Sequence, residues 1–217
     1  MKQFLVIGAG RFGAGLVKEL SSQGAEVIVW DKNKKKLEEV EEYATHCFVG
    51  DLRENDIIDQ MEIEEFDAVF TAIGTDAYSA ILIVKKLKER NAKKIIAKAI
   101  KKEVGEILLA LGASKVVYPE EEAGMKIARQ EYLGEVKDFF EISRGVSAVE
   151  IPVPEQLWGQ TLSGLDFSRK FGLNVSLLVR KEKAILSHFA DLPFEEGDYL
   201  VVVGENKKIM KFRKKFS

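Results

Sequence analysis

The sequence contains little cysteine and histidine and almost no excess charge. Its 217 residues include one cysteine, Cys47, and two histidines, so an internal disulfide is impossible and the usual zinc-ligand spacings are missing. A lone cysteine is typical of a reducing compartment. Acidic and basic residues nearly cancel, with 35 Asp and Glu against 33 Lys and Arg. The overall charge therefore favours neither nucleic acid nor an anionic membrane as a partner.

A membrane span and a leader are missing as well. No uncharged apolar run approaches the roughly 18 residues of a spanning helix. Met1 leads almost directly into the apolar run Phe4–Ile7, which leaves no room for a signal peptide. We therefore expect a cytosolic protein, and any role at a membrane would come through a partner.

Catalytic signatures are scarce. None of the five tyrosines has a lysine four residues later, and no Gly-x-x-x-x-Gly-Lys-Ser/Thr loop for phosphoryl transfer is present. His46 and Cys47 are adjacent on a predicted strand and point to opposite faces, which argues against a shared metal. Hydride transfer requires an acid or base placed near the cofactor. The simplest interpretation is binding without turnover, and a small NAD-dependent oxidoreductase is the alternative.

A glycine-rich turn near the N-terminus is the strongest positive signal. Gly8, Gly10 and Gly13 follow the apolar run Phe4–Ile7 and open a helical pattern. In this context the first glycine permits a tight turn, the second lets the backbone approach a pyrophosphate, and the third lets the helix pack close to the strand. The N–H groups at the helix start attract phosphates. Asp31, at the end of the next apolar run, has the spacing of an acid that accepts hydrogen bonds from ribose hydroxyls.

The charge of Asp31 bears on the kind of nucleotide. Its carboxylate should repel a ribose 2′-phosphate, although Lys32 and the lysines after it could soften this repulsion. We therefore favour NAD-type ligands or other nucleotides with unphosphorylated ribose over NADP.

Further candidates follow the other predicted strands. Asp51 could accept a hydrogen bond from the adenine amino group, or cap a helix that starts near Glu54. Arg11 and Lys98 could reach the phosphates, or be solvated surface cations. The small residues after the fourth strand could let the backbone pass close to the ligand, or form a tight turn. The predicted site residues from this reasoning are Gly8, Gly10, Arg11, Phe12, Gly13, Asp31, Lys32, Asp51, Leu52, Ala72, Ile73, Gly74 and Lys98.

Apolar runs alternate with helical patterns up to residue 118, which predicts an α/β domain with a Rossmann-like, doubly wound parallel sheet. The expected strands are Phe4–Ile7, Val27–Trp30, His46–Val49, Ala68–Ala72, Ile95–Ala97 and Val116–Tyr118, and the expected helices cover 11–23, 33–43, 54–59, 77–90 and 102–111. A further helix, from Glu120 to about Leu133, has no strand to return to. We interpret it as a crossover helix that leads out of the domain.

The pattern changes near Gly134, and the rest of the chain reads as a small α+β module. Its expected strands are Ala148–Pro152, Val175–Val179, Ala184–Ser187 and Tyr199–Val203, with helices near Asp166–Phe171 and Asn206–Lys214. We place the domain boundary between residues 134 and 135, giving domains 1–134 and 135–217. So thin a core favours an interface with another copy. Apolar residues alternate with the terminal lysines, so we interpret these as the polar face of an amphipathic helix and expect no nucleic-acid binding.

Several segments together carry a family resemblance. They are the turn Gly8–Gly13, Tyr43–His46, Ala72–Gly74, Leu111–Ala113, the crossover segment Tyr118–Ala128, and the C-terminal stretches Leu165–Phe167 and Gly197–Gly204. With these residues the chain resembles the TrkA/KtrA-type cytosolic regulators of bacterial potassium uptake, the RCK (regulator of potassium conductance) family. The most specific part is the Pro-Glu-x-x-x-Gly-x-x-x-Ala crossover segment combined with the C-terminal module.

The resemblance implies a nucleotide-sensing gating subunit that binds NAD, NADH, ATP, ADP or AMP without consuming it. It implies dimers paired through the crossover helix and joined into a ring, typically an octamer, made of this chain alone or with a related second RCK subunit. The ring would dock beneath a TrkH/KtrB-type membrane subunit that translocates potassium. The resemblance also adds Glu120, near the phosphates and able to help hold a cation; the alternative is an acidic residue favoured at a helix start. In some relatives the C-terminal domain binds a second effector such as cyclic di-AMP, and that site stays open here.

Overall fold

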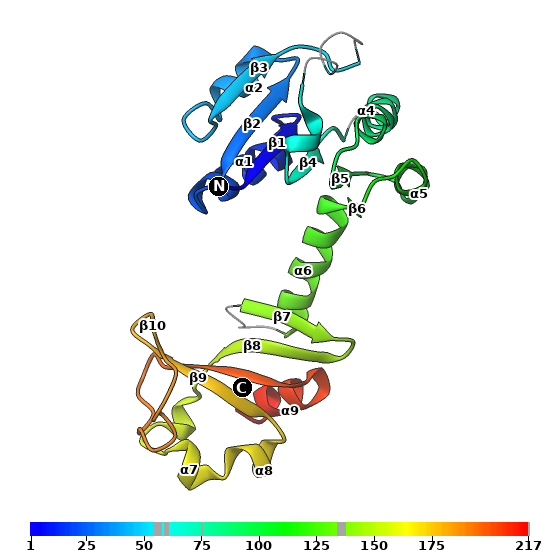
Figure 1. The fold of residues 1–217 in the computed structure, drawn as a ribbon. Coiled ribbons are helices and arrows are strands. Elements are labelled where there is room, and N and C mark those ends of the chain that lie inside the picture. The colour runs from blue at the N-terminus through cyan, green and yellow to red at the C-terminus, as the bar shows by residue number, and fades with distance from the viewer. Residues whose placement is uncertain (54–57, 59–60, 75, 134–137, 217) are drawn as a thin grey trace. The chain divides into compact units, whose positions relative to one another are not determined.

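The chain folds into two units, Met1–Glu122 and Ala123–Ser217 (Figure 1). The computed structural model describes residues 1–53, 58, 61–74, 76–133 and 138–216. The limit between the units falls inside helix α6 (Pro119–Leu133). The functional boundary at 134/135 stays a prediction. The helix expected over 54–59 lies outside the described residues, except for Ile58.

The first unit is built on a six-stranded parallel sheet. Its strands are β1 (Gln3–Ile7), β2 (Glu26–Asp31), β3 (His46–Val49), β4 (Ala68–Thr71), β5 (Ile95–Lys98) and β6 (Lys115–Val117), in the order β3-β2-β1-β4-β5-β6. Helices α1 (Arg11–Ser22), α2 (Lys34–Glu38), α4 (Ala77–Glu89) and α5 (Lys102–Ala110) and the short η1 (Ile63–Glu65) connect them. The predicted Rossmann-like sheet is confirmed. The strand order reverses between β1 and β4, which in such sheets is where ligands bind, outside the carboxyl ends of the strands.

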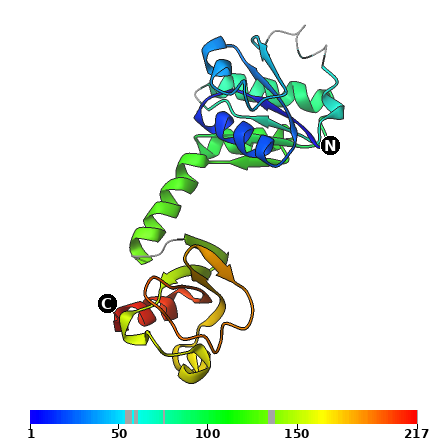
Figure 2. The same ribbon diagram turned by 90° about the vertical axis from the view of Figure 1, so that its left-hand side faces the viewer.

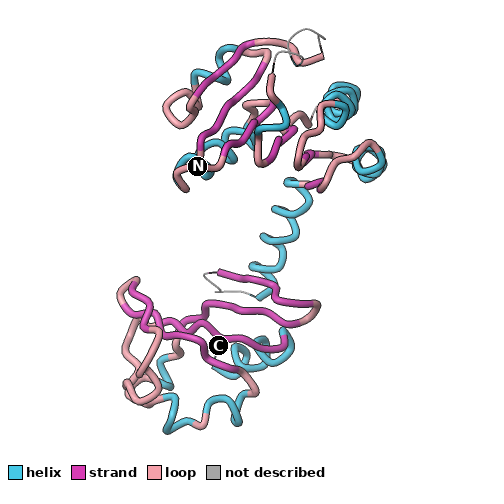
Figure 3. The backbone as a smooth tube through the Cα atoms, in the orientation of Figure 1, coloured by secondary structure: helices cyan, strands magenta, loops and turns pink. Residues whose placement is uncertain are grey.

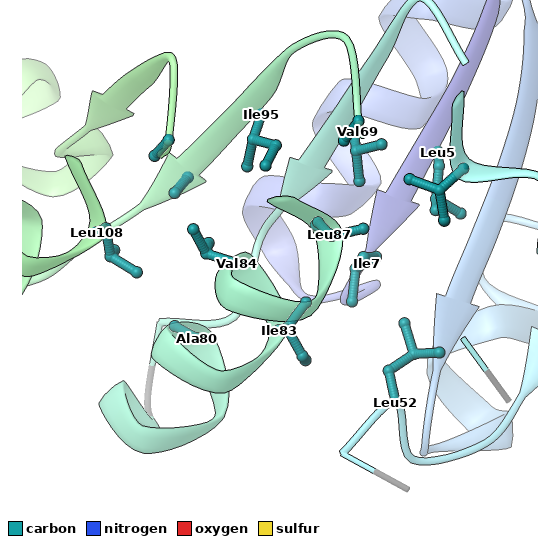
Figure 4. Close-up of a cluster of buried hydrophobic side chains, with 14 of the residues drawn as sticks. Leu5, Ile7, Leu52, Val69, Ala80, Ile83, Val84, Leu87, Ile95 and Leu108 are labelled. Carbon is teal, nitrogen blue, oxygen red and sulfur yellow. The ribbon is translucent and has the colours of Figure 1, made fainter. Parts of the chain in front are cut away.

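Helices cover both faces of this sheet, and each face has its own core (Figure 2). Successive residues of a strand point to opposite faces. Leu5 and Ile7 of β1 therefore pack with Ile83 and Leu87 of α4, whereas Val6 packs on the other side with Val17 of α1. Figure 4 shows the α4 side, where the side chains from the strands and from α4 meet. These two layers hold the strand ends that form the site.

Helix α2 is shorter than the sequence predicted. We expected a helix over 33–43, but the helix ends at Glu38 and the chain continues in turns. Asn33 caps its start by accepting from the Lys35 N–H at 3.0 Å. The expected second half is rich in glutamates three and four residues apart, whose like charges repel each other and the negative helix C-terminus.

The second unit carries a five-stranded antiparallel sheet (Figure 3), and its strand order is β10-β9-β11-β8-β7. Its elements are β7 (Asp138–Ser143), β8 (Val146–Pro152), η2 (Glu155–Leu157), α7 (Leu162–Leu165), α8 (Phe167–Phe171), β9 (Asn174–Arg180), β10 (Lys183–Ile185), β11 (Tyr199–Glu205) and α9 (Asn206–Phe216). The α+β prediction is confirmed, although β7 was not among the predicted strands. The helix predicted near Asp166–Phe171 is confirmed as α8, whereas α7 was not predicted; Asp166, in a left-handed conformation (φ 44°), separates the two.

The last helix packs as predicted. Ile209 and Phe212 of α9 are buried in the core of the second unit, so the lysines around them in the sequence lie on the polar side of an amphipathic helix. In the part of the chain that the structure describes, no helix is long and apolar enough to span a membrane.

Candidate nucleotide-binding site

The three glycines of the turn after β1 serve different purposes. Gly8 has a positive φ of 100° and donates its N–H to the Trp30 carbonyl at 2.7 Å. A Cβ on Gly13 would lie 1.9 Å from the Gly8 carbonyl oxygen, so any side chain there would collide with the turn. Gly10 has an ordinary extended conformation (φ −69°, ψ 179°), and a Cβ there would meet nothing within 4 Å among the described residues. Neither the backbone conformation nor the packing requires glycine at Gly10. The missing side chain leaves open space beside the backbone, as a pyrophosphate-binding turn needs.

Helix α1 starts at this open space. Gly10 is its N-cap, no described side chain caps it, and no acid lies in its first turn. The first intrahelical bond that follows the cap runs from the Ala14 N–H to the Gly10 carbonyl at 2.8 Å. The first-turn N–H groups therefore face the opening without a side-chain acceptor, and such groups attract anions.

Asp31 lies directly beside the turn. Its Oδ2 accepts from the Ala9 N–H at 2.7 Å, and its Oδ1 accepts from the Asn33 N–H at 2.8 Å. These bonds fix the carboxylate between the loops after β1 and β2. Each carboxylate oxygen has a further acceptor position, so Asp31 can hold the turn and still accept from two ribose hydroxyls.

The loop after β3 is held by several contacts. The Trp30 Nε1 donates to the Gly50 carbonyl at 3.0 Å, and the buried Lys86 of α4 donates through Nζ to the Leu52 carbonyl at 3.4 Å and the Arg53 carbonyl at 2.5 Å. Leu52 itself points into the core (Figure 4), so its side chain packs while its backbone shapes the loop. Sequence reasoning missed Lys86, because a lysine in a helical pattern looks like a surface residue.

Asp51 makes its contacts with Arg53. The guanidinium of Arg53 binds both carboxylate oxygens, and its Nε lies 2.9 Å from each. These hydrogen bonds lower the pKa of Asp51 to about 2. Sequence reasoning missed Arg53 as well. The alternative role of Asp51, as the cap of a helix near Glu54, concerns residues outside the described ones.

The segment after β4 lies close to the glycine turn. A Cβ on Gly8 would come 3.3 Å from the backbone of Ala72 and from the Ile73 side chain, and a Cβ on Gly74 would come 2.9 Å from Lys98 Cε. Small residues here therefore allow the β4 loop, the turn and Lys98 to approach one another. Thr75, which follows them, lies outside the described residues.

A cluster of charged and aromatic side chains lies at the start of α1. Its members are Arg11, Phe12, Lys98 and Glu120. Lys98 Nζ lies 2.7 Å from Glu120 Oε1 and 5.7 Å from the centre of the Phe12 ring. The pKa of Glu120 lies below its ordinary value, first because Lys98 donates to it, then through its own backbone N–H, with a further contribution from the charge of Arg11. The predicted phosphate-side residues thus meet in one cluster. No group of three or more His, Cys, Asp or Glu side chains that could hold a metal occurs in the described part of the chain.

A switch-point turn with an open helix N-terminus and an acid beside it defines a nucleotide-binding type of Rossmann domain, here followed by a small α+β domain. The TrkA-N domain model matches residues 4–119, and the TrkA-C domain model matches residues 146–217. The chain belongs to the TrkA-N/TrkA-C family that includes the Ktr potassium uptake proteins. It is 34% identical to the Ktr system potassium uptake protein C of Bacillus subtilis over 214 residues, covering 99% of this chain and 97% of that protein.

A second relative agrees with this placement, and a solved structure has a similar fold. The Ktr system potassium uptake protein A of Vibrio alginolyticus is 30% identical over 208 residues, which covers 96% of this chain and 94% of that protein. A solved structure of the GsuK channel bound to NAD matches with a TM-score of 0.59 at 16% identity. That match covers 96% of this chain and 38% of the GsuK chain, so the likeness in fold extends over part of that longer chain.

Proposed function

We propose that this protein is the nucleotide-sensing regulatory subunit of a potassium uptake system. It binds an adenine nucleotide at the carboxyl ends of β1, β2 and β4 and passes the resulting change in conformation to a membrane subunit. The observation that carries the proposal is the open space at Gly10, beside Asp31, in a chain that is 34% identical to a Ktr uptake protein along nearly its whole length. A ligand shifts a conformational equilibrium when it prefers one of the two states.

The ligand is an adenine nucleotide with unphosphorylated ribose, such as NAD, NADH, ATP, ADP or AMP. The helix start offers N–H groups to phosphates, and the Asp31 carboxylate suits two free hydroxyls better than a 2′-phosphate. The GsuK structure with NAD supports the class of ligand, since its fold matches this chain. Arg11, Lys98 and Glu120 lie on the side where the phosphates would bind, and Glu120 could help hold an accompanying cation.

The protein binds this nucleotide without consuming it. Lys98 is paired with Glu120, and Asp51 is paired with Arg53. Side chains that form ion pairs with each other are suited to holding a ligand, and they are less suited to giving or taking a proton. The names of the relatives, which are potassium uptake proteins, support a regulatory role over an oxidoreductase.

The protein acts in the cytoplasm as dimers joined into a ring, typically an octamer, beneath a TrkH/KtrB-type potassium-translocating subunit. Residues 121–129 of α6 are exposed, among them Met125 at 44% and Ile127 at 60%. Helix α5 similarly exposes Ile107 at 45% and Leu109 at 50%. Exposed apolar side chains of this kind mark surfaces that pair with other chains, so α6 is the proposed site of dimer pairing.

Calorimetric titration with ATP, ADP, AMP, NAD, NADH and NADP tests the proposal, together with chromatography of the nucleotide after prolonged incubation. We expect binding of one or more of the first five, weaker binding of NADP, and recovery of the nucleotide unchanged. Absence of binding by all six would refute the proposed function. Conversion of NADH or ATP would favour an enzyme instead.

A further inference from the structure

Arg53 occupies the acceptor that the adenine base is predicted to use. Its guanidinium donates to both oxygens of Asp51, and its backbone N–H donates to Asp51 Oδ1 at 3.0 Å. A carboxylate offers about four acceptor positions in total. Three donors from one residue therefore leave Asp51 little capacity for an incoming amino group. While this pair is formed, Asp51 is a poor acceptor for a base.

A second carboxylate lies within reach of the same guanidinium. Arg53 Nη1 is 3.8 Å from Asp76 Oδ2. Asp76 is fixed at the start of α4, because its Oδ1 accepts from the Ser79 N–H at 3.1 Å and its Oδ2 accepts from the Ser79 hydroxyl at 2.5 Å. The guanidinium thus lies between two anchored acids, one after β3 and one before α4.

The backbone of Arg53 is anchored, whereas its side chain is partly exposed to solvent. Lys86 holds the Arg53 carbonyl from α4, whereas 40% of the Arg53 side chain is exposed. Lys32 lies near both acids, since its charge adds to the lowering of the pKa of Asp51 and of Asp76, after their hydrogen bonds to Arg53 and Ser79. Two acids and two cations balance, so moving the guanidinium from one acid to the other leaves the net charge of the cluster unchanged.

We propose that Arg53 competes with the nucleotide base for Asp51 and thereby sets the base preference of the site. This inference rests on the proposed function. A 6-amino purine donates to Asp51 and displaces the guanidinium onto Asp76. A 6-oxo purine presents an acceptor at the same position, so it gains nothing from a vacated Asp51 and can instead accept from Arg53. Arg53 therefore weakens the binding of adenine nucleotides but not of hypoxanthine nucleotides. The affinity of the site for adenine then exceeds its affinity for hypoxanthine by a smaller factor.

The test compares AMP and IMP by calorimetry in the full-length protein, wild type and Arg53→Ala. Loss of one well-oriented ion pair at a partly exposed site corresponds to about fivefold in affinity. We expect Arg53→Ala to bind AMP about fivefold more tightly and IMP no more tightly than wild type. The matched control is Arg169→Ala, which removes an arginine paired with Asp166 in the second unit and should change neither affinity.

A double-mutant cycle separates competition from a merely structural effect. Asp76→Asn keeps an oxygen for the Ser79 N–H but removes the charge that receives the displaced guanidinium. We expect it to weaken AMP binding in the wild-type background and to have no effect in the Arg53→Ala background. AMP affinity that is unchanged or lower in Arg53→Ala, or an equal effect of Asp76→Asn in both backgrounds, would overturn the inference while leaving nucleotide sensing intact. A wild-type protein that binds neither AMP nor IMP would refute the proposed function and this inference with it.

Discussion

At the scale of single residues, the site depends on a few side chains that do two things at once. Asp31 ties the turn after β1 to the loop after β2, and it keeps acceptor capacity toward the open space at Gly10. The glycine spacing and the distance to the acid predicted this meeting, because both follow from the geometry of one strand-turn-helix unit. Arg53 and Lys86 could not be found in the same way. Lys86 reaches the Leu52 and Arg53 carbonyls from a helix that is distant in sequence, and Arg53 pairs with Asp51 at a spacing of two residues that no helix or strand period marks.

The charge of Asp31 should matter for affinity more than for folding. We expect Asp31→Asn to weaken NAD or AMP binding about tenfold or more, because hydrogen bonds to a charged group contribute about 1.5–3 kcal/mol. Calorimetry provides the measurement. Asp67→Asn is the matched control, since Asp67 also accepts a backbone N–H, from Gln3 at 2.8 Å, at the amino ends of the strands. Equal dissociation constants for wild type and Asp31→Asn would remove the ribose assignment.

The pair of Asp51 and Arg53 predicts a pH dependence of stability. The pKa of Asp51 is lowered from 3.8 to about 2 in the folded protein, chiefly by the hydrogen bonds from Arg53. A carboxyl whose pKa falls on folding stabilises the protein above its unfolded pKa, and this contribution is lost as the pH falls through the folded value. Between pH 4 and about 2, the free energy of unfolding should therefore fall less in Arg53→Ala than in wild type. Parallel urea titrations would show this, and identical slopes would contradict it.

At the scale of elements, the sequence was informative wherever an element carries its own pattern of apolar residues. All six strands of the parallel sheet were predicted, because buried runs bounded by turns stand out in an α/β chain. The errors fall where the helix end depends on charge or on an unusual backbone conformation. Helix α2 stops before a glutamate-rich stretch, and the short α7, which Asp166 ends by adopting φ 44°, was not predicted.

The close contact between α1 and the turn after β1 predicts that alanine substitutions at two glycines of α1 change the stability of the protein in opposite directions. Gly13→Ala should destabilise the protein by about 1–3 kcal/mol or more, because its Cβ would lie 1.9 Å from the Gly8 carbonyl oxygen. Gly15→Ala, whose Cβ would meet nothing within 4 Å among the described residues, should stabilise by up to about 1 kcal/mol through helix propensity. Thermal unfolding of both variants checks this. Equal melting temperatures would show that the helix does not pack as closely as described.

At the scale of the whole molecule, the family comparison and the exposed helices both support the proposed assembly with other chains. The two domain models match most of the chain, and α5 and α6 expose apolar residues that the proposed assembly would cover. The sequence predicted two domains from the change of pattern near Gly134. The family resemblance placed dimer pairing on the crossover helix, but the residue pattern by itself gave no partner surface, because exposure is a property of the folded chain and no periodicity reports it.

The proposed dimer contact on α6 predicts a loss of assembly in one variant. Ile127→Glu introduces a charge into the exposed apolar surface of α6 and should lower the mass measured by light scattering. Leu186→Glu is the matched control, because Leu186 is a 72% exposed leucine in the second unit, and it should leave the mass unchanged. A wild-type protein that is a monomer with and without nucleotide would contradict the proposed ring.

The most direct test of nucleotide sensing is calorimetric titration of Gly10→Ala beside Gly15→Ala, using the nucleotide that binds wild type best. Gly10 has an extended backbone and open space for a Cβ among the described residues, so alanine there should leave folding intact and occupy only the place of the pyrophosphate. We predict a loss of affinity of at least about tenfold for Gly10→Ala and none for Gly15→Ala, with both proteins folded. Undiminished binding by Gly10→Ala would contradict the assignment of this turn as the nucleotide site.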